Sequence, residues 1–216
     1  MVSNNIRQGD SRMKSSINRA LVVGVSDYEI ETMNDLEFCR NDGEKMLDVL
    51  KTIGYDVSNN IEHGLIGHVK YDQLRNSIYD FFANPDNGAN DTLIFYYSGH
   101  GIPDSDGDVY LSTSEIDPEE PYRSGFSFND LTRRINNCVS TKIVIILDCC
   151  YSGAAKISKG ISKGTEDSVA NVATAAINDK SRAFQDNRGV CLLAASQASQ
   201  EAYALKEEEN SLLHTI

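Results

Sequence analysis

The chain has 216 residues, of which 40% are hydrophobic and 24% are charged, as is usual for a globular protein with a core of its own. Lysine and arginine total 20 against 32 aspartate and glutamate residues, so the formal charge is −12. This balance argues against sequence-independent binding of nucleic acid and against binding to an anionic membrane, because both need a basic surface. It favours basic partners or substrates, although solubility alone is the plainer explanation.

The sequence indicates a reducing, intracellular location. No apolar run approaches the roughly 20 residues that a membrane-spanning helix needs, and residues 1–16 lack the hydrophobic core of a signal peptide. The five cysteines include no CxxC pair, and the four histidines are scattered. We therefore expect a cytoplasmic protein with buried free thiols and without a structural zinc site.

The first elements along the chain are a leader, a strand and two helices. Residues 1–18 are polar and uneven, which predicts a flexible leader. The apolar run RALVVGVSDY that follows predicts a buried strand of a parallel sheet. Apolar residues then recur at helical spacing over residues 31–55 and again over residues 71–88. Gly54 is expected to end the first of these helices, and Pro85 the second.

The later elements continue the alternation of strands with helices. DTLIFYYSGHG predicts a second buried strand that runs into a glycine-flanked turn, and VYLSTS predicts a short strand or hairpin arm. FSFNDLTRRINNC predicts a helix with Ser127 or Asn129 as its cap. TKIVIILDCCYSG and GVCLLAASQ predict two further buried strands. The order predicts βαβ units and therefore an α/β fold around a parallel sheet.

A histidine stands at the expected end of the second strand. Ligands of parallel sheets bind beyond the carboxyl ends of the strands, so this edge is where chemistry is expected. His100 lies there between Gly99 and Gly101, and glycines let the chain turn and let another backbone approach closely. Position alone leaves a catalytic role and a structural role for His100 about equally supported.

A cysteine stands at the matching end of the third strand. Cys150 follows KIVIILD in a small-residue turn, where backbone N–H groups can lower the pKa of a thiol and hold an oxyanion. Parallel strands would bring this turn to the same edge as His100, and a thiol beside an imidazole is the smallest activated nucleophile. Cys149 is the alternative, but adjacent side chains on a strand point to opposite faces, so only one of the two can face His100.

The stretches YYSGHG at 96–101 and DCCYSG at 148–153 together resemble the caspase and metacaspase superfamily of cysteine peptidases. The histidine precedes the cysteine by about 50 residues, and this spacing is already known from caspases. Gln-Ala before the cysteine is absent, so the likeness is to the metacaspase and prokaryotic branch. The resemblance runs from about Ala20 to the end. It implies a three-layer fold, with helices on both faces of a mostly parallel sheet, and Cys150 as the nucleophile.

The resemblance also implies the residues that bind substrate. Asp148, together with Asp42, would form an acidic pocket for Arg or Lys, with Cys39 as a wall and Ser98 lining it. The backbone N–H groups of Gly101 and Cys150 would hold the oxyanion. Asp148 could instead be a capping or ion-pair residue, and an aspartate such as Asp42 near a helix start is also favourable for the helix dipole.

These assignments predict a cysteine endopeptidase with a Cys-His dyad that cleaves protein or peptide substrates after Arg or Lys. Self-cleavage in the polar linker is one interpretation of its basic residues and a lysine-rich solvated linker is the other; these residues are Lys156, Lys159, Lys163, Lys180, Arg182 and Arg188. One alternative is a catalytically silent scaffold or regulator of the same fold. Another is a nucleotide-binding doubly wound domain, but GVSDYE after the first strand is not the GxGxxG that such a domain needs.

The expected organisation is a catalytic core over 19–152, an exposed linker over 153–188 and a truncated small-subunit-like part over 189–216. A second subunit or fused domain would complete the fold. Calcium activates many metacaspases and stays possible here, but Asp104, Asp106 and Asp108 around Gly107 do not meet the EF-hand pattern. A solvated hairpin loop is the preferred interpretation of that segment, so neither a cofactor nor a metal site is predicted.

Overall fold

The computed structural model describes residues 16–58, 60, 64–150 and 189–195. The leader predicted over 1–18, except for residues 16–18, lies outside the described residues. So do the linker predicted over 153–188 and all of the segment 189–216 beyond residue 195. The division into these parts therefore stays a prediction.

Seven strands form one sheet within the described residues. The central strand β3 pairs in parallel with β1 and β6, and β1 and β6 pair in parallel with β2 and β7 respectively. Only β4 and β5 are antiparallel. The strands are β1 Asn18–Val25, β2 Ile66–Gly67, β3 Thr92–Pro103, β4 Val109–Leu111, β5 Phe126–Ser127, β6 Lys142–Cys150 and β7 Gly189–Ala195.

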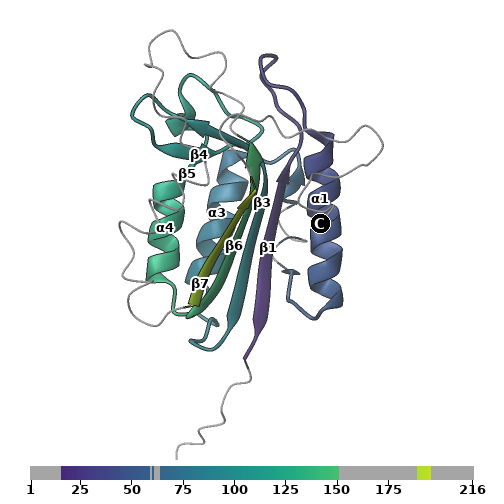
Figure 1. Cartoon of the computed structure of the whole chain (residues 1–216), viewed down its shortest axis with the longest axis vertical. Helices are drawn as coiled ribbons and strands as arrows, with labels where there is room; N and C mark the ends of the chain where they lie inside the picture. Colours follow the sequence, from purple (N-terminus) through teal and green to yellow (C-terminus); the bar gives the residue numbers. More distant parts are fainter. Residues whose placement is uncertain (1–15, 59, 61–63, 151–188, 196–216) are drawn as a thin grey trace, which may run out of the picture.

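Helices cover both faces of this sheet, as Figure 1 shows. Helix α1 (Glu37–Thr52) lies on one face, and α3 (Tyr71–Ala83) and α4 (Phe128–Asn137) lie on the other. A short 3-10 turn over Pro121–Arg123 precedes β5. The predicted α/β fold with a mostly parallel sheet between helical layers is confirmed.

The sheet separates two apolar cores because successive strand residues point to opposite faces. The larger core lies towards α3 and α4 and includes Leu21, Phe95 and Leu131. The smaller lies towards α1 and includes Val22 and Tyr96. Strand β1 contributes to both, which explains why its sequence is continuously apolar.

The first helix is shorter than its apolar spacing predicts. It begins at Glu37 and not near residue 31, because the backbone N–H of Leu36 donates to the carbonyl of Ser26 at 2.8 Å and closes a loop. We call residues 26–36 the arm. The helix ends at Thr52, just before Gly54, whose φ of +89° only glycine adopts easily.

The remaining elements follow the sequence with small differences. Helix α3 ends at Ala83, two residues before Pro85. Of the two residues predicted to cap α4, Ser127 is the N-cap, although its side chain makes no capping hydrogen bond. The VYL part of VYLSTS is a hairpin arm, since β4 pairs with the end of β3.

The hairpin loop between β3 and β4 is organised by its own carboxylate. Asp104 Oδ1 accepts the backbone N–H groups of Asp106 and Asp108 at 2.9 Å each. Among the described residues, no three or more His, Cys, Asp and Glu side chains gather where they could hold a metal ion. None of the helices in the described ranges is long and apolar enough to cross a membrane.

Helix α1 approaches strand β1 closely where two glycines meet. A Cβ atom at Gly24 would lie 2.5 Å from the backbone oxygen of Cys39, whereas one at Gly43 would lie 3.4 Å from its nearest neighbours. The first distance is far below van der Waals contact and the second is ordinary contact. The missing side chain of Gly24 therefore sets how close the helix lies to the sheet.

We expect Gly24→Ala to lower the free energy of unfolding by about 1–3 kcal/mol, because the new methyl group meets a backbone atom that cannot move independently. Gly43→Ala is the matched control, and its loss should be smaller because alanine also favours the helix. Urea denaturation of the two variants measures the difference. Equal losses would contradict the close approach at Gly24.

Candidate active site

The pairing of β3 with β6 brings the two sequence motifs together. Ser98 pairs with Asp148, Gly99 with Cys149, and His100 with Cys150. The predicted turn at Gly99–Gly101 is wrong, since β3 continues to Pro103 where β4 pairs with it. The register nevertheless brings both motifs together at the carboxyl edge of the parallel sheet, as predicted.

The two adjacent cysteines have different positions. Cys149 is 2% exposed and belongs to the large core on the side of α3 and α4. Cys150 is the residue whose backbone stands in register with His100. This is the arrangement expected if Cys149 is a packing residue.

Both backbone polar groups of His100 are hydrogen-bonded. Its N–H donates to the hydroxyl of Tyr28 at 3.1 Å. Its carbonyl accepts from the backbone N–H of Ser112 at 3.0 Å and from the hydroxyl of Tyr97 at 2.9 Å. The position of this residue is therefore fixed by two neighbouring segments as well as by its own strand.

The imidazole of His100 is buried, with 6% of the residue exposed. Nε2 lies 3.3 Å from the backbone carbonyl of Asn34. A carbonyl oxygen only accepts, so Nε2 carries the hydrogen in the neutral ring and Nδ1 carries the lone pair. Burial lowers the pKa of His100 to about 4, against the smaller opposing effect of the Asn34 carbonyl. The ring is therefore neutral at physiological pH.

Three hydroxyl groups form a chain of hydrogen bonds beside His100. Ser112 Oγ lies 3.0 Å from the Tyr28 hydroxyl and 2.9 Å from the Tyr97 hydroxyl. Burial raises the pKa of both tyrosines, so both hydroxyls keep their protons. Gly99 leaves the room that this arrangement needs, because a Cβ atom there would lie 2.6 Å from the Tyr97 hydroxyl.

The four residues predicted to bind substrate lie around the hydroxyl of Tyr96. Burial is the main reason that the pKa of Tyr96 is raised, and the negative charges of Asp148 and Asp42 raise it further. Both carboxylates are thus within electrostatic reach of one buried hydroxyl. We call the four the acid cluster, and all of them are buried: Cys39, Asp42, Ser98 and Asp148.

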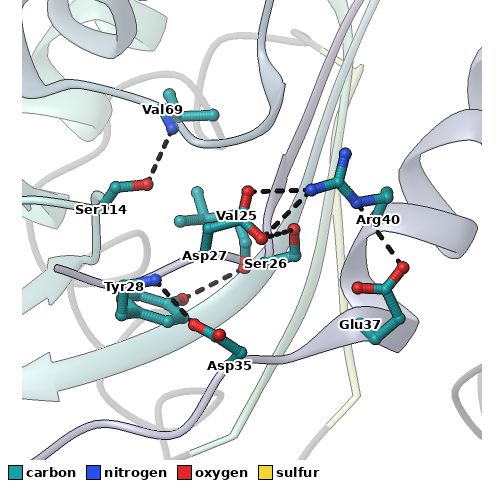
Figure 2. A network of polar contacts seen from close by, with 9 residues as sticks. All are labelled: Val25, Ser26, Asp27, Tyr28, Asp35, Glu37, Arg40, Val69 and Ser114. Carbon is teal, nitrogen blue, oxygen red and sulfur yellow. Dashed lines mark hydrogen bonds and ion pairs between the residues drawn. The ribbon is translucent and has the colours of Figure 1, made fainter. Parts of the chain in front are cut away.

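The arm is tied to helix α1 and to the end of β1, as Figure 2 shows. Arg40 on α1 donates to both carboxylate oxygens of Asp27, at 2.8 and 3.1 Å. The Tyr28 N–H donates to Asp35 Oδ1 at 2.9 Å. Ser114 supports the neighbouring segment by accepting the Val69 N–H at 2.8 Å.

Sequence patterns did not indicate the partners of His100. Tyr28 and Asn34 lie in the arm, which has no periodicity, and Ser112 follows a three-residue strand. The one available signal was the interval between the strand RALVVGV and the first residue of the helix, because a long connection at the ligand edge often carries site residues.

Comparison with known proteins finds relatives both in sequence and in structure. Metacaspase-1 of Plasmodium falciparum (isolate 3D7) is 30% identical over an alignment of 153 residues, and the match covers 63% of this chain. The chain spans about a quarter of that relative, 24% of its length. A Geobacter sulfurreducens protein of solved structure superposes with a TM-score of 0.53 at 16% identity. The match covers 85% of this chain and 74% of that protein, and it shows the fold alone.

A family comparison covers nearly the whole sequence. The profile described as the caspase domain matches residues 17–215, which include β3, β6 and the arm. The match agrees with the resemblance of the two motifs and with the observed sheet and helices. The chain therefore belongs to the caspase domain family.

Proposed function

We propose that this chain is a cysteine endopeptidase that cleaves peptide bonds after Arg or Lys, with Cys150 as nucleophile and His100 as base. The observation that carries the proposal is the register of β3 and β6, which sets Cys150 beside a buried histidine whose Nδ1 holds the lone pair. Family membership supports a peptidase, and the residue roles are inferred from the arrangement.

The reaction uses the neutral imidazole as a proton carrier. His100 Nδ1 takes the thiol proton of Cys150 as the sulfur attacks the substrate carbonyl, and it gives that proton to the leaving amine. This produces a thioester between Cys150 and the acyl part of the substrate. Water then attacks the thioester while His100 accepts its proton, and the returning proton restores the thiol. The Asn34 carbonyl helps by stabilising the ring while it is positively charged.

The direction of the Gly101 N–H supports the proposed oxyanion site. Along a strand, the N–H and C=O groups of one residue point to one edge and those of the next residue to the other. The polar groups of His100 face Tyr28 and Ser112, so the Gly101 N–H points to the opposite edge, where β6 lies. That direction is the one required to reach a carbonyl under attack by Cys150.

The acid cluster supports specificity for a basic residue. Asp42 is fully buried and Asp148 is 7% exposed, and taking two carboxylates out of water is costly. A guanidinium or ammonium group of a substrate would be attracted by both charges. Ser98, which pairs with Asp148 across the two strands, would add a hydroxyl contact.

Replacement of the nucleophile is the direct test of this activity. Cys150→Ala should lower cleavage of Arg- and Lys-containing peptides on the order of 10³-fold or more, because no thiol remains to form the thioester. Cys149→Ala is the matched control and should keep its activity, since Cys149 packs in the core. Mass spectra of wild type and Cys150→Ala show at the same time whether the basic linker is cut by the chain itself.

Cleavage that survives in Cys150→Ala would refute the assignment of Cys150 as the nucleophile. A wild-type chain that neither cleaves basic peptides nor reacts at Cys150 with a thiol probe would favour the silent scaffold. Cleavage after acidic residues would leave the mechanism standing but contradict the specificity.

Neutralising the acid cluster tests the specificity. Asp148→Asn and Asp42→Asn should each lower kcat/KM for an Arg substrate by about 10- to 100-fold, since each removes a charge that pairs with the guanidinium. Asp48→Asn is the control, because Asp48 is an exposed carboxylate on α1, the helix that also carries Asp42. Equal kcat/KM values in the Asp48, Asp42 and Asp148 variants would refute the proposed role of the acid cluster.

The protonation state of the base is also measurable. In a Cys150→Ala protein labelled at histidine, the imidazole resonance of His100 should titrate near pH 4, because burial disfavours the charged ring. The ring then stays neutral, and able to accept a proton, at every higher pH. The resonance is assigned by its absence in His100→Gln, and a midpoint near the ordinary value of about 6.5 would contradict the buried, neutral base.

A further inference from the structure

We propose that the arm, residues 26–36, positions His100 and that the Arg40–Asp27 ion pair clamps the arm against helix α1. Asp27, Tyr28 and Arg40 are then positioning residues and do not touch the substrate. The consequence for catalysis rests on the proposed function, whereas the consequence for the placement of His100 does not.

The arm contacts both the backbone and the ring of His100. Tyr28 accepts the His100 N–H, and its ring stacks at a tilt against the imidazole with centroids 4.9 Å apart. Asn34, near the other end of the arm, presents its carbonyl to Nε2. A displacement of the arm would therefore release the orientation of the ring and the position of the backbone together.

The arm has neither a helix nor a strand of its own, so separate contacts must hold it. The Leu36 N–H donates to the Ser26 carbonyl and closes its base. Asp35 ties the Tyr28 N–H from within, and the Glu29 N–H donates to the Ser114 carbonyl at 2.8 Å. The Arg40–Asp27 pair is the side-chain link between this loop and α1 that lies nearest to Tyr28 in sequence.

The guanidinium of Arg40 lies between the arm, the start of α1 and strand β2. Asp27 takes both hydrogen bonds, and a carboxylate oxygen of Glu37 lies 3.7 Å from Arg40 Nε. A Cβ atom at Gly67 would lie 2.9 Å from an Arg40 guanidinium nitrogen, and φ at Gly67 is +95°. Glycine at that position thus allows both the backbone conformation and the approach of the guanidinium.

The exposure of the pair shows that its role is more positional than energetic. Arg40 and Asp27 side chains are 34% and 38% exposed, and ion pairs this open contribute about 0–1 kcal/mol to stability. One guanidinium nitrogen, Nη2, nevertheless reaches both carboxylate oxygens of Asp27 and so restricts how that carboxylate can turn. Because Arg40 lies between Cys39 and Asp42 on α1, the clamp also fixes the arm, and with it His100, relative to the acid cluster.

The test compares Arg40→Gln and Asp27→Asn with Arg133→Ala. Arg133 forms a 2.9 Å ion pair with Asp130 on α4, so its removal costs a similar contact away from the arm. We expect kcat for an Arg peptide to fall by about two- to five-fold in the two clamp variants, since misplacement of a base slows the reaction. KM and the melting temperature should change no more than in Arg133→Ala.

Hydrogen exchange of the His100 amide provides a readout that does not depend on peptidase activity. Its rate should rise by about two- to five-fold in Arg40→Gln and Asp27→Asn and by more in Tyr28→Phe, and stay unchanged in Arg133→Ala, because an amide that loses its acceptor or its cover exchanges faster. Wild-type exchange rates in both clamp variants would overturn the proposal. If the wild type cleaves no peptide, the proposed function fails, and the exchange rates still decide whether the arm positions His100.

Discussion

The hydrogen-bond ladder between β3 and β6 is the constraint on which the site depends. It sets Cys150 beside His100 and Asp148 beside Ser98, so one register places both the pair proposed to react and part of the acid cluster. A slip of one residue would turn every side chain of β6 to the other face, and would exchange the core residue Cys149 for Cys150. The buried faces of β6 forbid that slip, because Ile145 and Leu147 fill the core towards α3 and α4. Packing of the sheet thereby specifies the chemistry at its edge.

The sheet edge holds two environments that differ in charge although they adjoin on the same strands. Around His100 the neighbours are hydroxyls and a carbonyl, and burial keeps the ring neutral. Around Tyr96 the neighbours include two carboxylates. A neutral imidazole such as that of His100 is suited to accepting a proton. The carboxylates of the acid cluster are suited to holding a cation. Tyr96 and His100 lie on the same strand, β3. The two environments differ because His100 contacts the arm and Ser112, whereas Tyr96 lies near Asp42 and Asp148.

Sequence reasoning succeeded where the fold imposes a period or an edge. Apolar runs identified β1, β3, β6 and β7, and the rule that parallel strands present ligands at their carboxyl ends led to the edge where the two motifs meet in register. It failed for the length of α1 and for Tyr28, Asn34 and Ser112, because these lie in connections whose shape is set by contacts distant in sequence. It also placed a turn at His100, because the flanking Gly99 and Gly101 suggest one. The strand continues there because it pairs with β4, which is only three residues long and therefore gives a weak sequence signal. Local preference and tertiary pairing disagreed there, and pairing prevailed.

The arm and the sheet therefore contribute different things to the site. The sheet is held by two cores and cannot adjust without loss of packing, so it fixes where Cys150 and His100 stand. The arm is held by separate polar contacts of modest strength, so it can be displaced without unfolding the sheet. An enzyme of this design would fix the reacting residues through its core and the orientation of its base through a loop. The second of these can change while the first stays intact, because the contacts that hold them belong to different parts of the molecule.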